Sequence, residues 1–144
     1  MDILSNFSKR LKDLIEEKQI TPDDLSKAIN YNQVYHWLAG DYLPSFLNLI
    51  KIADYFQCTL DYLSGQDKES RSDTFKSCPP FAERLRFILK DKGFTIYRLS
   101  KLTKIDKRTI YDWLHNLYVP QLDNLKRIAS AFDCTLDYLV GREK

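Results

Sequence analysis

Apolar residues recur three and four positions apart along most of the chain, which is the spacing of one face of an α-helix. The clearest early run lies in residues 3–15, and a matching run begins at Phe81. The apolar members are Ile3, Leu4, Phe7, Leu11, Leu14 and Ile15 in the first run, and Phe81, Leu85, Ile88 and Leu89 in the second. No segment alternates apolar and polar residues as a half-buried strand does. The pattern therefore predicts an all-α protein.

Helix start signals divide each half of the chain into five predicted helices. Thr21 followed by Pro22 and two aspartates is typical of a helix start, because Thr caps the free amides and Pro suits the first helical position. The expected caps of a third helix are Asn30 and Asp106, and those of a short fifth helix are Thr59 and Thr135. A fourth helix follows Pro44 in one half and Pro120 in the other.

The two halves repeat one another. Residues 7–28 align with 81–102 and residues 29–65 with 105–141, leaving Thr103 and Lys104 unmatched, and 26 of the 59 aligned residues are identical. A repeat of this length that occurs twice indicates a duplicated domain rather than a solenoid. We expect domains at 1–65 and 81–144, joined by the polar segment 66–80, which spans at most ~50 Å when extended.

The charge of +2 is unevenly distributed. Residues 1–65 hold six basic and nine acidic side chains, residues 66–80 hold three of each, and residues 81–144 hold thirteen basic and eight acidic. The second copy is therefore the one suited to a polyanion.

Several classes of function lack their sequence signals. The three cysteines and two histidines are not spaced as metal ligands, and no nucleophile–base pair or glycine-rich phosphate loop is visible. We therefore expect no enzyme activity, metal or cofactor. No signal peptide or membrane span is recognisable, so a cytoplasmic location is expected.

Residues 95–114 read TIYRLSKLTKIDKRTIYDWL, with apolar anchors at Ile110 and Trp113. This segment resembles the helix-turn-helix of the lambda repressor and Cro (Xre-type) family, and the likeness covers about 120 residues, in two copies. The resemblance implies two tandem five-helix domains in a sequence-specific transcriptional regulator that binds double-stranded DNA, expected to be a repressor and a homodimer. No small-molecule effector is indicated.

The resemblance also implies which residues contact DNA. The start of the recognition helix enters the major groove, so in the second copy Lys107, Arg108, Thr109, Tyr111 and Asp112 are the expected readers. The expected phosphate contacts are Thr95, Lys101, Lys104, Tyr118, Gln121 and Lys126.

The first copy departs from this pattern. Because two residues are missing relative to Thr103–Lys104, its helix-turn-helix is expected to be tighter or re-angled. Its reading face would be Tyr31, Asn32, Gln33, Tyr35 and His36, which include no lysine or arginine, so it is at most a weaker DNA site. Leu43, Leu47 and Ile50 form an apolar stripe that is either a buried subunit or interdomain contact or extra packing against the domain's own first helix. The alternative function is a protein-interaction module formed by the first or both copies.

Overall fold

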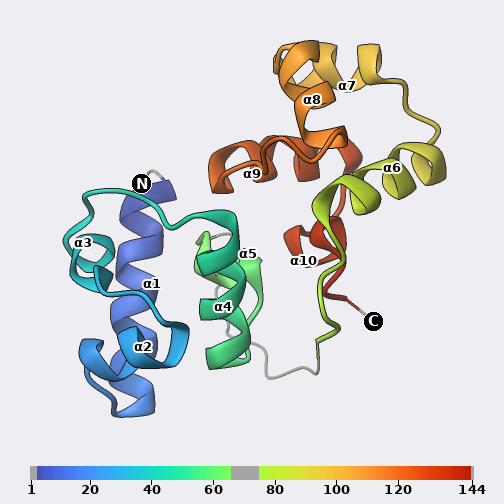
Figure 1. Cartoon of the computed structure of the whole chain (residues 1–144). Coiled ribbons are helices and arrows are strands. Elements are labelled where there is room, and N and C mark those ends of the chain that lie inside the picture. Colours follow the sequence, from blue (N-terminus) through green and yellow to red (C-terminus); the bar gives the residue numbers. More distant parts are fainter. Residues whose placement is uncertain (1–2, 66–74, 144) are drawn as a thin grey trace. The chain divides into compact units, whose positions relative to one another are not determined.

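The computed structural model of the chain describes residues 3–65 and 75–143, and the chain divides into two compact units that meet in sequence between residues 74 and 75. The first domain holds α1 (Ile3–Lys18), α2 (Pro22–Ile29), α3 (Val34–Ala39), α4 (Phe46–Phe56) and α5 (Leu60–Leu63). The second holds α6 (Phe81–Lys92), α7 (Ile96–Thr103), α8 (Lys107–Leu114), α9 (Leu122–Phe132) and α10 (Leu136–Val140). All regular structure in the described residues is helical (Figure 1), so the predicted fold class is confirmed.

Threonine side chains begin four of these helices. Thr21 forms a capping box with Asp24, in which each residue's side chain accepts from the other's backbone N–H, at 3.1 and 2.9 Å. Thr95 accepts from the backbone of Arg98 at 3.0 Å, and Thr59 and Thr135 cap α5 and α10 in the same way. A cap of this kind stabilises a helix by about 1 kcal/mol. The starts at Thr21, Thr59 and Thr135 were predicted correctly.

The same aromatic pair anchors both cores. Phe7 of α1 meets Trp37 of α3 edge-on, with ring centroids 6.5 Å apart, and Phe81 meets Trp113 at 6.4 Å in the second domain. Both tryptophans are buried. The apolar face of α1 therefore packs against α3, and that of α6 against α8. This packing fixes which face of α3 and of α8 is exposed to solvent.

The third helix of the first domain begins later than predicted. Asn30 does not cap it but ends α2 in the left-handed conformation, with φ +58°, as Lys104 ends α7 with φ +60°. Gln33 is the N-cap of α3 and makes no side-chain capping bond. Since α2 and α7 have 8 residues each while α3 has 6 and α8 has 8, the two missing residues come from the first turn of the recognition helix rather than from the turn before it.

The second domain begins before its first helix. The backbone N–H of Lys76 donates to the carbonyl of Arg142 at 2.8 Å, and the Arg142 guanidinium lies 4.0 Å from the centre of the Phe75 ring. Arg142 is itself buried and forms an ion pair with buried Asp137 of α10. Residues 75 and 76, which the sequence places in the linker, therefore pack on the end of the chain as part of the domain.

Candidate nucleic-acid interface

Helix α8 presents its first turn to solvent. Asp106 caps it by accepting from the backbone N–H of Arg108 at 3.3 Å, while Ile110 and Trp113 face the core. Lys107 and Arg108 are exposed, and within the described residues the Arg108 side chain has no hydrogen bond or ion pair. A guanidinium held at the start of an exposed helix with its donors available suits bidentate bonding to guanine in the major groove.

The later turns of α8 are more restricted. Thr109 and Asp112 are half-buried, and Tyr111 is 47% exposed. The Tyr111 ring stacks on His115, with centroids 6.5 Å apart, and His115 Nδ1 lies 2.8 Å from the Tyr111 carbonyl oxygen. The Tyr111 ring is thus held on the surface where an apolar contact to a thymine methyl is available to it.

Helix α7 adds an aromatic residue that sequence reasoning missed. Tyr97 is 56% exposed, and the Nζ atoms of Lys101 and Lys107 lie 5.4 and 5.1 Å from its ring centre. The guanidinium of Arg98 lies 4.2 Å from the Phe94 ring. Two of the expected DNA-contacting lysines, one from each helix of the helix-turn-helix, are therefore brought together on one ring.

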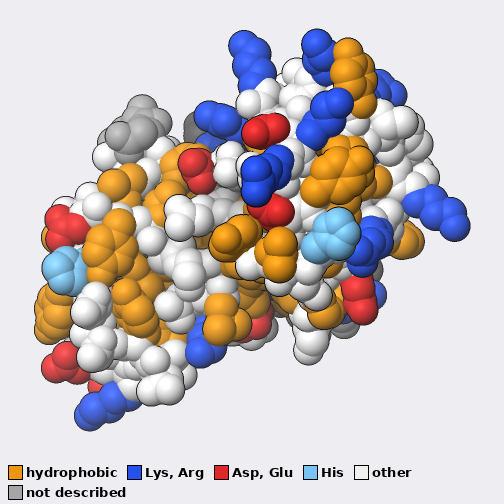
Figure 2. Space-filling view, turned by 45° about the horizontal axis from the view of Figure 1, so that its top comes forward, with side chains coloured by type: hydrophobic (Ala, Val, Ile, Leu, Met, Phe, Trp, Pro, Cys, Tyr) orange, Lys and Arg blue, Asp and Glu red, His pale blue; other side chains and the backbone are white. Residues whose placement is uncertain are grey.

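The remaining expected phosphate contacts come from the ends of α7, from the loop before α9 and from α9 itself. Thr95 and Lys104 are exposed at the start and end of α7, and Tyr118 is 67% exposed in the loop before α9. Gln121 is the exposed N-cap of α9 and makes no side-chain capping bond, and Lys126 is half-buried on that helix. Figure 2 shows more Lys and Arg side chains on the visible face of the second domain than on that of the first.

In the first domain, Tyr31 and Gln33 of the predicted reading face contact neighbouring aromatic side chains. Tyr31 stacks flat on Trp37, with ring centroids 4.6 Å apart, and Gln33 accepts a 2.9 Å hydrogen bond from Tyr42. The Tyr31 and Tyr42 hydroxyls lie 3.4 Å apart, and this hydrogen bond raises the pKa of Tyr42 to about 12. We call Tyr31, Gln33 and Tyr42 the tyrosine network. These contacts engage the Tyr31 hydroxyl and the Gln33 side-chain oxygen, which would otherwise be available to bond to bases.

The rest of the predicted first-domain face is also weakly suited to phosphate. His36 Nδ1 lies 2.8 Å from Asp41 Oδ2, which places a carboxylate at the surface of α3. Asn32 and Tyr35 are exposed, Tyr35 by 58%. Tyr31, Asn32 and Gln33 precede α3 instead of lying on it, so they do not form the first turn of that helix.

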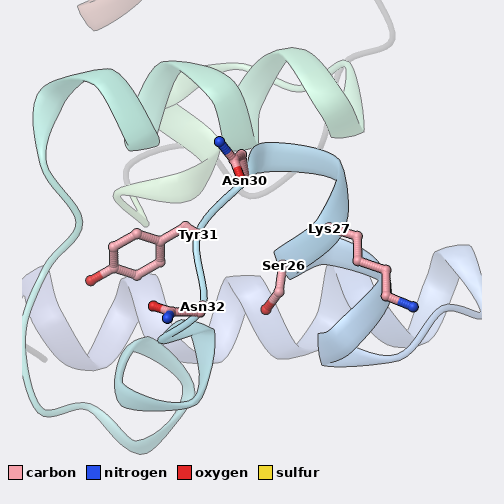
Figure 3. A pocket seen from close by; sticks show the side chains of 5 residues that line it. All are labelled: Ser26, Lys27, Asn30, Tyr31 and Asn32. Carbon is pink, nitrogen blue, oxygen red and sulfur yellow. The ribbon is translucent and has the colours of Figure 1, made fainter.

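An open hollow adjoins the shortened helix (Figure 3). Ser26 and Lys27 come from α2, and the segment after α2 supplies the others: Asn30, Tyr31 and Asn32. The Lys27 amine points away from Tyr31 (Figure 3). With one lysine among its five lining residues, the hollow is not a built anion site.

The starts of α2 and α7 differ in charge. Where α7 has Tyr97 and Arg98, α2 has Asp23 and Asp24. Hydrogen bonds from the Thr21 backbone and side chain lower the pKa of Asp24, so its carboxylate stays charged at neutral pH. The usual position for a phosphate at a helix start is thus electrostatically unfavourable in the first domain.

The apolar stripe of α4 is only partly on the surface. Leu47 is 62% exposed and Leu43 is half-buried, but Ile50 is only 8% exposed. Of the three residues, Leu47 is therefore the one whose side chain is most available to a partner.

Two family models match the chain. One, described as a Cro/C1-type HTH DNA-binding domain, matches residues 84–144, and one described as helix-turn-helix matches residues 11–63. Searches of curated proteins and of solved structures found no match. With the geometry above, the chain is a tandem helix-turn-helix protein of the Cro/C1 type, and the predicted resemblance is confirmed. These two matches support the assignment of the chain as a DNA-binding regulator.

Two other observations bear on the site. Within residues 3–65 and 75–143, no three His, Cys, Asp or Glu side chains gather as a metal site. None of the helices in these ranges has the length and apolar character that crossing a membrane requires.

Proposed function

We propose that the chain is a cytoplasmic, sequence-specific transcriptional repressor in which the second domain reads double-stranded DNA. The observation that carries this proposal is the difference in one helical turn between the two recognition helices. In α8 that turn is capped by Asp106 and presents Lys107 and Arg108, whereas in the first domain the corresponding turn is absent. The first domain serves subunit assembly or binds a partner, and it does not read a half-site equivalent to that of the second domain.

Charge favours the same division of labour. Binding a polyanion releases counterions in proportion to the number of phosphates that lysine and arginine neutralise. The exposed cations Lys101, Lys104, Lys107 and Arg108 surround the start of α8, while Asp23, Asp24 and Asp41 lie around α2 and α3. The second domain therefore gains affinity from counterion release, and the first gains little.

The proposal is tested by selecting preferred sites from random duplex DNA with the full-length chain. Affinity for the selected site is then measured between 50 and 200 mM salt. We expect a steep fall, since roughly six phosphate contacts would give about a thousandfold loss over this range. Absence of a preferred sequence, or affinity that does not respond to salt, would contradict a DNA-reading function and favour a protein-interaction module.

A homodimer formed through the first domains would present two second domains to a palindromic site. The exposed Leu47 side chain on α4 is the feature that favours such a contact. We expect Leu47→Asp to lower the apparent mass in solution while helicity is retained, because an exposed apolar side chain contributes little to its own domain. Sedimentation and circular dichroism measure the two quantities.

Ile50 provides the matched control. Because Ile50 is 8% exposed, Ile50→Asp buries a carboxylate and is expected to reduce helicity. If Leu47→Asp also unfolds the domain, or leaves the mass of a dimeric chain unchanged, Leu47 is not an interface residue.

A further inference from the structure

The Tyr97 ring is the centre of an unusual charge arrangement. The Nζ atoms of Lys101 and Lys107 lie 5.4 and 5.1 Å from its centroid, and the ring remains 56% exposed. Both distances are within the range of a cation–π attraction. We call Tyr97, Lys101 and Lys107 the lysine clamp.

The clamp joins the two helices that form the helix-turn-helix. Lys101 follows Tyr97 by four residues, so both side chains lie on one face of α7, whereas Lys107 is the first residue of α8. The ring therefore connects the start of the recognition helix to the helix before it. Without such a contact, Lys107 would be an exposed lysine with many rotamers.

Holding two ammonium groups against one ring costs electrostatic repulsion. Placing a surface lysine near a like charge also costs rotamer entropy. The attraction of the ammonium group to the ring must compensate for both costs. An anion beside the pair relieves the repulsion and gains from both cations. A backbone phosphate of DNA is the anion that reaches this surface when α8 lies in a groove.

The first domain provides an internal comparison. Its α2 has Asp23 in place of Tyr97 and Lys27 in place of Lys101, and the turn corresponding to Lys107 is missing. The ring and one lysine are thus absent in the domain with the incomplete recognition helix. The lysine clamp is therefore present in the domain whose recognition helix keeps its first turn, and absent in the domain whose recognition helix lacks it.

We propose that Tyr97 is a positioning residue that holds Lys101 and Lys107 for a DNA backbone phosphate, which fixes the register of α8 in the groove. This inference rests on the proposed function of the second domain. Tyr97 acts through the two lysines and does not itself read a base.

The test uses full-length chains and the selected duplex at fixed salt. Tyr97→Ala is expected to weaken binding about five- to thirtyfold, since the two lysine side chains are then not ordered beforehand and must lose rotamer freedom on binding. Tyr97→Phe keeps the ring and should bind within about twofold of the unmodified chain. In a Lys101→Ala/Lys107→Ala background, Tyr97→Ala should change affinity by less than about twofold, because no lysine remains to be positioned.

Phe87 is the matched control, because it is also a half-exposed ring beside a cation, 51% exposed with the Arg84 guanidinium 4.9 Å from its centroid, but lies on α6. Phe87→Ala should leave DNA affinity within about twofold, and circular dichroism should show all variants folded. An equal loss from Phe87→Ala, a loss from Tyr97→Ala that persists without the lysines, or no loss at all would overturn the positioning role while leaving the proposed function intact. If the unmodified chain lacks salt-dependent binding, both fail.

Discussion

Replacing Arg108 with alanine is expected to cost about 1–3 kcal/mol of DNA affinity and to relax the preference at one or two base pairs of the selected site. The physical reason is that Arg108 lies in the first exposed turn of α8 and, among the described residues, its side chain has no competing hydrogen bond or ion pair. A bidentate contact to guanine loses both energy and discrimination when it is removed. Binding measured against single-base variants of the site gives both quantities.

Two further variants make this result specific. Lys126→Ala should weaken binding to all site variants alike and reduce the salt slope by about one, as loss of a phosphate contact does. Asn32→Ala should have little effect, because Asn32 precedes α3 instead of opening a recognition helix. Equal losses from Asn32→Ala, together with none from Arg108→Ala, would mean that the first domain is the reader.

Replacing Arg142 with alanine is expected to destabilise the second domain by about 3–5 kcal/mol, because it removes the buried guanidinium that forms an ion pair with the buried Asp137 carboxylate. The same change removes the guanidinium that packs on Phe75. A core of this size rarely supplies more than about 3–5 kcal/mol in total, so the domain should be largely unfolded. Two-dimensional NMR would then show collapse of second-domain signals while first-domain signals persist.

The paired replacement is the control. Changing Asp137 to Leu and Arg142 to Met together removes both charges and should restore much of the stability. In the first domain, Asp61→Ala should cost less, because Asp61 is only half-buried where Asp137 is buried. A second domain whose unfolding free energy is unchanged by Arg142→Ala would show that the buried pair is not what stabilises it.

The sequence was sufficient to predict the number and order of the helices. It was not sufficient to locate the two residues that the first domain lacks relative to the second. Aligning Ile29 with Ile105 put the gap in the turn, yet Ile29 and Thr103 are the residues that end α2 and α7, and both are buried. Thr103 tolerates burial because its hydroxyl donates to the Leu99 carbonyl at 2.7 Å and accepts from the backbone of Ile105 at 3.2 Å. A polar residue that is buried with local hydrogen bonds is not recognisable as a core position from sequence. Ile29 was therefore aligned with Ile105 instead of Thr103.

The candidate site was predictable where it depended on local sequence. Asp106, Lys107 and Arg108 follow one another, and a cap followed by two cations can be read directly. The tyrosine network and the lysine clamp cannot, because they join residues of different elements, such as Gln33 with Tyr42 and Tyr97 with Lys107. Helical spacing alone also does not tell the edge of a core from a surface stripe, so the burial of Ile50 and the exposure of Leu47 could not be told apart in sequence.

The attachment of Phe75 and Lys76 to the end of the chain shortens the tether between the domains. Between Gly65 and Phe75 the chain spans at most ~35 Å, compared with ~50 Å for the whole polar segment. One domain confined so close to another experiences it at about millimolar effective concentration. Under the proposed function, weak contacts of the first domain would therefore be strengthened in the intact chain relative to the separated domains, and a partner bound to the first domain would be held close to DNA bound by the second.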